Sequence, residues 1–283
     1  MKPNFLIIGA ARSGTTSLYK YLNDHPQIVI SEIKELNYFS RDKYWRKGFA
    51  WYEKNFVPKN KSTIIFGEAS TSYSQAPYSP NVPKRIFSYN PEIKLIYVVR
   101  DPIERLISHF MQRTKAGLET REFYKLLENL DDIFYVWQGK YYYQLSQYLH
   151  YFKKEQIHII TFDDLIYDID IVIYRLFEYL GVRQFNLGEK INIVHNASGK
   201  IIRKNIIGLS ILNIYHTFIE QRKIPYFIKG YINMLANLGG VEIKKPNISD
   251  EQKGLLLEYY KEDLILLTKE FGINTNQWID KYI

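Results

Sequence analysis

Cysteine is absent from the 283-residue chain, and so is any long hydrophobic run. Without cysteine there are no disulfides, no thiolate metal ligands and no cysteine nucleophile, and we expect a cytoplasmic protein. The longest mainly apolar run without charge, residues 205–219, is too short to cross a bilayer and contains Asn213 and His216. The apolar run at residues 5–11 is brief and has no cleavage-like spacer, so we expect neither a leader peptide nor a transmembrane segment.

The charge is unbalanced toward the basic side, with 38 Lys and Arg against 30 Asp and Glu, a net charge of +8. Such a balance favours an anionic partner: a nucleotide, an acidic or sulfated glycan, a nucleic acid or a membrane surface. The basic residues are dispersed rather than clustered with aromatic residues, so we expect no nucleic-acid partner. His109, His150 and His158 lack the spacing of metal ligands, and we expect no metal site.

Residues 9–16, GAARSGTT, follow an apolar run and precede an apolar-periodic segment, which predicts a strand, a glycine-bounded loop and a helix. In that layout the loop N–H groups and the positive end of the helix dipole converge on one anion. The P-loop pattern places a lysine directly after its second glycine. Here Thr15 follows Gly14, and the cation is Arg12. The loop is therefore predicted to bind a phosphate but is poorly suited to cleave a triphosphate.

Apolar, β-branched runs alternate with helical patterns along the first two thirds of the chain. Strands are predicted at residues 5–8, 27–31, 63–66, 95–99 and 157–161. Helices are predicted at residues 15–24, 82–89, 103–115, 141–152 and 165–180, and from residue 201 onward only helices are expected, the last over residues 250–271. This alternation predicts an α/β fold with a P-loop-like central parallel sheet flanked by helices and a helical C-terminal portion. No linker is evident, so we expect a single domain over residues 1–283.

A family resemblance rests on residues 5–39, FLIIGAARSGTTSLYKYLNDHPQIVISEIKELNYF. This block resembles the sulfotransferases that depend on 3′-phosphoadenylyl sulfate (PAPS), especially bacterial members related to the heparan-sulfate type. The shared features are the strand–loop–helix, the turn His25-Pro26, and Lys34-Glu35 followed by an aromatic pair. Residues 95–108, LIYVVRDPIERLIS, match a second block of the family. The resemblance implies transfer of a sulfuryl group from PAPS, with PAP as the product, to a hydroxyl, or alternatively an amine, of a carbohydrate or small natural product.

One other function class stays open, a P-loop kinase or NTPase that uses ATP. That function requires the missing loop lysine and an acidic magnesium ligand at a strand end. Asp101 is the only candidate for such a ligand, and we interpret it as the cap of a helix that begins at Pro102. The sequence gives no prediction of oligomeric state.

The resemblance implies that donor binding involves two phosphate sites and a late loop. The 5′-phosphosulfate is assigned to Arg12, Ser13, Gly14, Thr15 and Thr16. The 3′-phosphate is assigned to Arg100 and Ser108, because a guanidinium fork and a hydroxyl suit a phosphate; pairing of Arg100 with Asp101 or Glu104 is the competing interpretation. The late loop that closes over the 3′-phosphate end is assigned to Ser198, Gly199, Lys200 and Arg203, with a basic surface loop as the alternative.

The catalytic residues implied by the resemblance are Glu35, Lys34 and Arg12. Glu35 matches the position of the glutamate base in the heparan-type enzymes. A base is needed because the acceptor hydroxyl must lose a proton as it attacks. Lys34 is expected near the donor, and Arg12 is expected to offset charge on the leaving phosphate. Glu32, three residues earlier, is interpreted as structural or surface.

Three positions near these residues depart from the pattern or lack an assigned role. Asn37 stands where heparan-type enzymes often have a histidine, and Ala69 where they often have a lysine. Glu68 is predicted either to hold Lys34 or Arg12 or to contact the acceptor. Aromatic residues between Trp45 and Tyr52 are predicted to border the acceptor cleft or to belong to the core.

Overall fold

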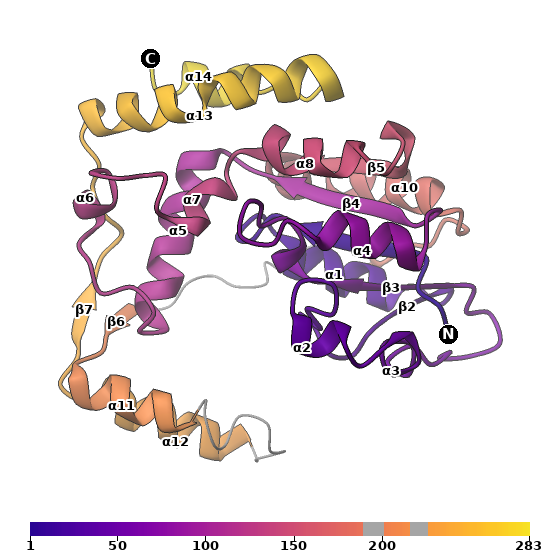
Figure 1. The fold of residues 1–283 in the computed structure, drawn as a ribbon, viewed down its shortest axis with the longest axis horizontal. Coiled ribbons are helices and arrows are strands. Elements are labelled where there is room, and N and C mark those ends of the chain that lie inside the picture. Colours follow the sequence, from indigo (N-terminus) through magenta and orange to yellow (C-terminus); the bar gives the residue numbers. More distant parts are fainter. Residues whose placement is uncertain (189–200, 216–225) are drawn as a thin grey trace. The chain divides into compact units, whose positions relative to one another are not determined.

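The computed structural model describes residues 1–188, 201–215 and 226–283 (Figure 1). The chain divides into two compact units. Unit 1 comprises Met1–Leu106, Asp131–His195 and Asp250–Ile283, and unit 2 comprises Ile107–Leu130 and Asn196–Ser249. The expectation of a single domain over residues 1–283 stays a prediction.

Unit 1 is built on a parallel sheet in which the strands lie in the order β2-β3-β1-β4-β5. The strands are β1 (Phe5–Gly9), β2 (Ile28–Ile30), β3 (Ile65–Ala69), β4 (Lys94–Val99) and β5 (Ile157–Thr161). Each neighbouring pair is parallel, with Leu6 opposite both Glu68 of β3 and Leu95 of β4. All five strands predicted from the sequence are therefore present, although β3 begins at residue 65 rather than 63. The α/β fold class is confirmed.

Helices surround this sheet. They are α1 (Thr15–Asp24), α2 (Asp42–Trp45), α3 (Phe49–Glu53), α4 (Val82–Tyr89), α7 (Phe134–Trp137), α8 (Tyr141–Leu149), α9 (Phe162–Tyr167), α10 (Ile169–Leu180), α13 (Asp250–Phe271) and α14 (Asn276–Asp280). The described part of the unit also has short 3₁₀ turns at Thr71–Tyr73 and Lys154–Gln156. Helix α5 (Pro102–Lys115) begins in unit 1 and continues into unit 2.

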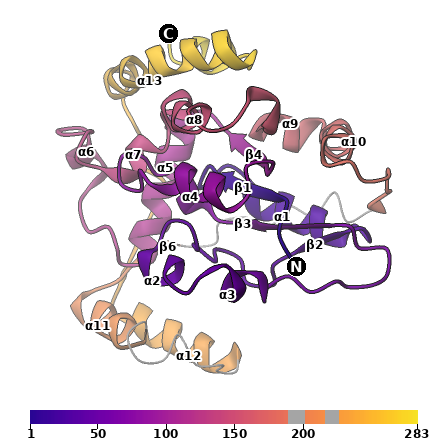
Figure 2. The ribbon, with the colours of Figure 1, turned by 45° about the vertical axis from the view of Figure 1, so that its right-hand side comes forward.

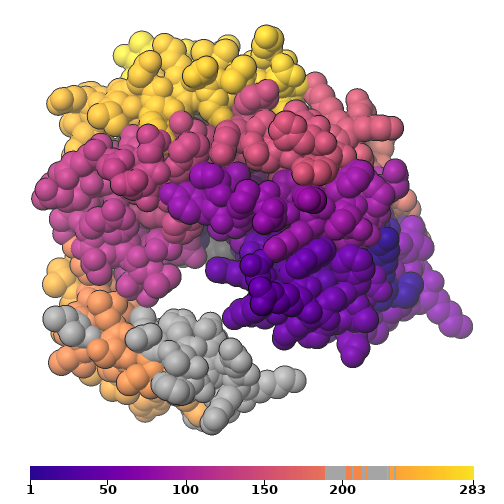
Figure 3. Space-filling view, viewed as in Figure 1, coloured from indigo at the N-terminus to yellow at the C-terminus, as the bar shows by residue number. Residues whose placement is uncertain are grey.

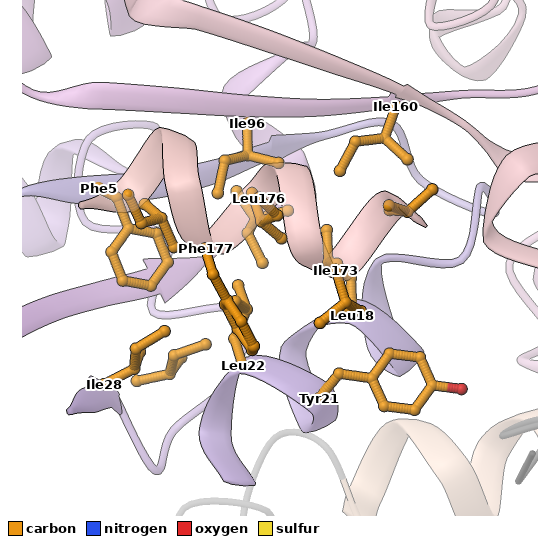
Figure 4. Close-up of a cluster of buried hydrophobic side chains, with 14 of the residues drawn as sticks. Phe5, Leu18, Tyr21, Leu22, Ile28, Ile96, Ile160, Ile173, Leu176 and Phe177 are labelled. Carbon is orange, nitrogen blue, oxygen red and sulfur yellow. The ribbon is translucent and has the colours of Figure 1, made fainter. Parts of the chain in front are cut away.

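One face of the sheet is covered by α1 and α10 (Figure 4). Leu18 and Leu22 of α1 are four residues apart, which places them on the same side of the helix. They pack with Leu176 and Phe177 of α10 in a buried apolar cluster that includes Ile96 of β4. This cluster holds the first helix against the sheet and so fixes the loop between β1 and α1.

Helix α13 packs along α8 (Figures 1, 2 and 3). The buried Asp263 carboxylate accepts hydrogen bonds from the backbone N–H groups of Tyr142 and Tyr143 at 2.9 and 2.8 Å. These groups belong to the first turn of α8, where free N–H groups need an acceptor. Burial raises the pKa of Asp263 to about 6 in spite of these bonds. The expected helical C-terminal portion is therefore present, and α13 has the predicted bounds.

The predicted helix over residues 165–180 is two helices, α9 and α10, which meet at Asp168. The Thr161 side chain accepts a hydrogen bond from the Asp164 N–H at 3.0 Å and caps α9, so helical structure begins earlier than the apolar periodicity indicates. Asp168 has φ −130° and ψ 35°, outside the helical region, and this interrupts the turn. The prediction of one continuous helix was wrong.

Unit 2 contains α6 (Phe123–Leu126), α11 (Ile206–Ile214), α12 (Tyr226–Asn237) and a second sheet. In that sheet β6 (Ile201–Arg203) pairs antiparallel with β7 (Val241–Ile243). The prediction that only helices follow residue 201 was therefore wrong, because strands of three residues are too short to show a period of two. Within the described ranges, no helix combines the length and the apolarity needed to cross a membrane.

The close approach of β3 to β1 yields a stability prediction. A Cβ atom at Gly67 of β3 would lie 2.4 Å from ring atoms of the fully buried Phe5. Gly67→Ala is expected to lower the free energy of unfolding by about 1–3 kcal/mol, because the ring has no room to move away.

Gly254→Ala is the matched control, since nothing lies within 4 Å of a Cβ at that position in α13. It is expected to raise stability by about 0.5–1 kcal/mol through helix propensity. Urea unfolding of both variants measures the two changes, and equal midpoints for the two proteins contradict the packing argument.

Candidate active site

The carboxyl ends of β1, β3 and β4 lie at one edge of the sheet, because these neighbouring strands are parallel. The segments that leave these ends carry the predicted residues Arg12 to Gly14 after β1 and Arg100 after β4, and also Thr71 after β3, which was not predicted. The Glu35 segment joins the same edge, because the Glu35 N–H donates to the Ala69 carbonyl at 2.9 Å. Ligands of open parallel sheets bind at this kind of edge.

The loop between β1 and α1 has the geometry of a phosphate cradle. It is held at its base by the Ala10 N–H, which donates to the Val98 carbonyl at 2.8 Å. Arg12 and Gly14 have left-handed φ values of 71° and 90°. A side chain at Gly14 would also crowd the Phe162 ring, at 3.0 Å, which explains the second glycine. Helix α1 begins directly afterwards, at Thr15, so its free N–H groups face this loop.

The side chains of the loop fit an anion. Ser13 is fully buried, and its hydroxyl has no hydrogen-bond partner among the described residues. Burial, and next the charge of Arg100, lower the pKa of Arg12. Arginine nevertheless stays protonated at neutral pH, so two cations lie close together. A phosphate group in the loop would offset their repulsion and supply the acceptor that Ser13 lacks.

Arg100 is fixed at both its backbone and its side chain. The Tyr141 hydroxyl donates to the Arg100 carbonyl at 2.6 Å, and the guanidinium lies 4.5 Å from the centre of the Phe162 ring. One guanidinium nitrogen donates to the Arg12 carbonyl at 3.3 Å, and another is 3.8 Å from the Glu104 carboxylate. The alternative pairing with Glu104 is thus present. Ser108 lies within the α5 segment assigned to unit 2, and its joint grip with Arg100 stays a prediction.

Asp101 caps α5 as expected. Its Oδ1 accepts hydrogen bonds from the N–H groups of Ile103 and Glu104 at 3.0 and 3.2 Å. The interpretation of Asp101 as a cap alone was wrong, because its Oδ2 binds Lys281 and Tyr282.

Lys34 connects the start of α1 to Glu35. Its ammonium donates to the Thr16 hydroxyl at 2.7 Å and lies 3.8 Å from the Glu35 carboxylate. Burial lowers the pKa of Lys34, while the Glu35 charge opposes that change. The structure therefore brings Lys34, Glu35 and the first turn of α1 into one chain of contacts.

Thr71 holds the Glu35 carboxylate in place. The Thr71 N–H donates to Glu35 Oε2 at 2.8 Å, and the Thr71 hydroxyl lies 3.2 Å from Oε1. Burial raises the pKa of Glu35, and the Lys34 charge and the Thr71 hydrogen bonds limit that rise. The sequence analysis did not identify Thr71. Its position two residues after β3, at the edge where ligands of open parallel sheets bind, is the signal that was available.

Asn37 supports the backbone of Glu35. Glu35 and Asn37 both have left-handed φ values, 60° and 54°, which non-glycine residues seldom adopt. The Asn37 amide donates to the Glu35 carbonyl at 2.6 Å and accepts a hydrogen bond from the Ser72 hydroxyl. The Asn37 N–H donates to the Ser70 hydroxyl at 3.0 Å. Asn37 therefore shapes the loop that carries Glu35, a role that its place in the sequence did not indicate.

Glu68 is fully buried and makes no hydrogen bond to Lys34 or Arg12, so the prediction that it holds either cation was wrong. Burial raises the pKa of Glu68 to about 7, and the nearby hydroxyls of Tyr73, Ser70 and Tyr52 limit this rise. Within the described chain, neither carboxyl oxygen makes a hydrogen bond of good geometry. A contact with an acceptor would require access that this burial does not provide.

The aromatic residues after Asn37 divide between core and surface. Tyr52 is fully buried and stacks on Tyr38, with ring centres 4.3 Å apart. Trp45 and Trp51 are half-buried, and Phe49 is exposed. Trp45, Trp51 and Phe49 therefore leave ring surface for a ligand.

The predicted late loop falls mostly outside the described residues, which is the case for Ser198, Gly199 and Lys200. Arg203 lies on β6 in unit 2, where its guanidinium bonds the Glu122 carboxylate and the Arg121 carbonyl. Its proposed contact with a donor stays a prediction.

Comparison with known proteins shows which family the chain matches. Residues 2–231 match the family model described as a sulfotransferase domain. The membrane-associated sulfotransferase kil1 of Dictyostelium discoideum is 39% identical over 110 residues, which are 38% of this chain and 22% of that protein. Heparan sulfate glucosamine 3-O-sulfotransferase 5 of Mus musculus is 32% identical over 174 residues, which are 58% of this chain and 49% of that protein. The chain thus covers about half or less of the length of these relatives.

Among solved structures, a sulfotransferase from Alicyclobacillus acidocaldarius has the same fold. The TM-score is 0.67 at 22% identity, and the match covers 98% of this chain and 99% of that chain. Mouse sulfotransferase SULT7A1 complexed with PAP matches with a TM-score of 0.51 at 13% identity, over 100% of this chain and 90% of that chain.

The buried Glu68 yields a prediction of pH dependence. Its pKa is about 7 in the folded protein against a usual value of 4.5. Below pH 4.5 the carboxyl is protonated in both the folded and the unfolded protein, so it does not affect stability. As pH rises from 4.5 to 7, the unfolded protein loses this proton while the folded protein keeps it, which progressively lowers the free energy of unfolding. Above pH 7 this loss of stability is complete. Glu68→Gln removes this cost and is expected to raise the free energy of unfolding at pH 8 by about 3 kcal/mol.

Urea unfolding at pH 4 and pH 8 checks the expected difference between the two pH values. Glu32→Gln is the control, because Glu32 is exposed. A Glu68→Gln variant that gains nothing at pH 8 relative to pH 4 contradicts the expected titration.

Proposed function

The chain belongs to the sulfotransferase domain family, and from that premise we propose that it transfers a sulfuryl group from PAPS to a hydroxyl of a carbohydrate or small natural product. An amine acceptor is the alternative. One observation carries the proposal: a single ammonium, that of Lys34, contacts both the first turn of the phosphate-loop helix and the candidate base Glu35. This arrangement places a proton acceptor beside an anion site, which is what sulfuryl transfer to a hydroxyl requires.

The donor is assigned to the groups that fit its anions. Arg12, Ser13, Gly14, Thr15 and Thr16 are proposed to hold the 5′-phosphosulfate, supported by the unpartnered hydroxyl of Ser13 and the free N–H groups of α1. Arg100 with Ser108 is proposed to hold the 3′-phosphate. The late-loop residues Ser198, Gly199, Lys200 and Arg203 are proposed to close over that end.

Glu35 is proposed as the general base. As the acceptor oxygen forms its bond to sulfur, the acceptor proton passes to the Glu35 carboxylate, while the bond from sulfur to the 5′-phosphate oxygen breaks. Thr71 keeps the carboxylate oriented through its N–H and hydroxyl. Arg12, Lys34 and the loop N–H groups offset the charge that develops on the leaving phosphate. No metal ion is needed for this distribution of charge.

A glycan acceptor is supported by the relative from Mus musculus, whose name specifies heparan sulfate glucosamine. Two departures from the heparan-type pattern keep both a glycan and a small natural product as possible acceptors. Ala69 stands where those enzymes often have a lysine, and Asn37, where they often have a histidine, is hydrogen-bonded to the Glu35 loop. Trp45, Phe49 and Trp51 are proposed to border the acceptor. A single catalytic domain and a cytoplasmic location belong to the same proposal.

Ligand binding separates the proposed function from an ATP-using enzyme. At a hundredfold excess over the dissociation constant, PAP is expected to stabilise the protein by about 2.7 kcal/mol, because it contacts both phosphate sites. ATP with magnesium is expected to stabilise it less, since Thr15 replaces the lysine that would reach a terminal phosphate. Thermal unfolding with each nucleotide measures the difference.

The companion assay measures sulfation in excess EDTA and phosphate release from ATP. Sulfation is expected to persist and phosphate release to stay at background. Equal stabilisation by PAP and ATP, or steady ATP hydrolysis, favours the kinase or NTPase alternative instead.

The role of Glu35 yields a kinetic prediction. Glu35→Gln is expected to keep PAP affinity and to slow turnover by about 10²–10⁴-fold, the range for loss of a general base. Because burial raises the pKa of Glu35, wild-type turnover is expected to fall as pH decreases through that pKa, when the base becomes protonated. Turnover and PAP binding are measured on the same preparations.

Glu32→Gln is the matched control, since Glu32 is an exposed carboxylate three residues away. It is expected to leave turnover within about twofold of wild type, as is usual for a surface carboxylate remote from a site. If Glu32→Gln is the slow variant and Glu35→Gln is not, the base has been assigned to the wrong residue.

A further inference from the structure

The segment that follows α14 binds the residue next to Arg100. The Lys281 ammonium and the Tyr282 hydroxyl both donate to Asp101 Oδ2, at 2.9 and 2.5 Å. The other oxygen of Asp101 is occupied by the first N–H groups of α5. Asp101 is almost fully buried, so Lys281 neutralises, and Tyr282 hydrogen-bonds, a carboxylate that has little access to water. They connect residues 180 positions apart in the chain.

The same C-terminal segment also supports the ring beneath Arg100. Trp278 of α14 donates its indole N–H to Asp163 Oδ2 at 3.0 Å, and Asp163 directly follows Phe162, whose ring lies against the Arg100 guanidinium. The Trp278 ring further meets the Tyr141 ring edge to face, with centres 6.4 Å apart. Tyr141 is the residue whose hydroxyl binds the Arg100 carbonyl. Four separate contacts from residues 278–282 thus reach the surroundings of Arg100.

The charges of Arg100, Glu104 and Lys281 also interact. Glu104 lies between two cations, with its carboxylate 3.8 Å from Arg100 and 3.7 Å from Lys281. Burial alone would lower the pKa of Lys281, but Asp101 and Glu104 raise it, so Lys281 is charged at neutral pH. Removing the Lys281 charge leaves the Glu104 carboxylate to interact more strongly with Arg100. A phosphate that binds Arg100 would then have to compete with a less neutralised carboxylate.

We propose that Lys281 and Tyr282 are positioning residues for the 3′-phosphate of the nucleotide. Both hold Asp101 in place, and Lys281 also partly neutralises the Glu104 carboxylate. The Arg100 guanidinium is therefore left available to the phosphate. This inference rests on the proposed function, which assigns the 3′-phosphate to Arg100. Neither residue touches the nucleotide in this account. Their effect passes through the backbone at Asp101 and through the shared carboxylate of Glu104.

The test measures affinity for two nucleotides that differ at the 3′-phosphate, PAP and 5′-AMP, by titration calorimetry on the full chain. Lys281→Met and Tyr282→Phe are each expected to weaken PAP binding by about tenfold, because Arg100 is then less well positioned for the 3′-phosphate. AMP binding is expected to change by less than about twofold, because AMP has no group for Arg100. Lys261→Met, an exposed lysine on α13, is the control and should leave both affinities unchanged.

A double variant tests the charge relation directly. Glu104→Gln combined with Lys281→Met is expected to recover most of the PAP affinity lost in Lys281→Met, because the competing carboxylate is gone. Lys281→Arg keeps the charge and is expected to bind PAP nearly as wild type does. A merely structural role for Lys281 predicts no recovery in the double variant.

The outcomes separate this inference from the proposed function. If wild-type protein and Arg100→Ala bind PAP equally well, the assignment of the 3′-phosphate to Arg100 is wrong. If Arg100→Ala loses PAP affinity while Lys281→Met and Tyr282→Phe keep it, the function stands and the positioning role is wrong. Equal losses of PAP and AMP affinity also overturn the positioning role, since they indicate general damage to the site.

Discussion

The parallel pairing of β1 with both β3 and β4 is the constraint on which the site depends. Parallel neighbours end at the same edge, so the loop between β1 and α1, Thr71 and Arg100 come together although they lie far apart in sequence. The cluster formed by α1, α10 and the sheet prevents the strands from shifting relative to the first helix. A change of one residue in register would turn Glu68 away from its buried position and displace Thr71 from Glu35.

Backbone strain is concentrated at this edge. Among the described residues, the non-glycine positions with left-handed φ are Arg12, Glu35 and Asn37, and all three belong to the candidate site. Each such residue costs about 1–3 kcal/mol, so surrounding contacts must hold it in place. For Glu35 these contacts are the Ala69 carbonyl, the Thr71 N–H and the Asn37 amide. An enzyme that must present a charged side chain in one orientation has reason to retain such strain.

Local patterns in the sequence predicted the local part of this structure. The bounds of α1, α4 and α13 and the presence of the five strands follow from hydrophobic periodicity, and the order strand–loop–helix predicted the loop between β1 and α1. The contacts that orient the site lie beyond any such pattern: Thr71 is 36 residues from Glu35, and Tyr141 is 41 residues from Arg100. No spacing rule connects residues so far apart, because only the folded sheet brings them together. The short strands β6 and β7 were missed for a different reason, since three residues carry no measurable period.

An ammonium reaches the loop helix from a separate segment of the chain. Thr15 stands at the position where the P-loop pattern has lysine, and it is buried. The ammonium comes instead from Lys34, on a separate segment, and reaches the loop helix at the Thr16 hydroxyl. The different origin of the ammonium changes its contacts. A lysine within the loop would contact only the phosphate, whereas Lys34 also lies beside Glu35. One charge therefore links the proposed anion site to the proposed base.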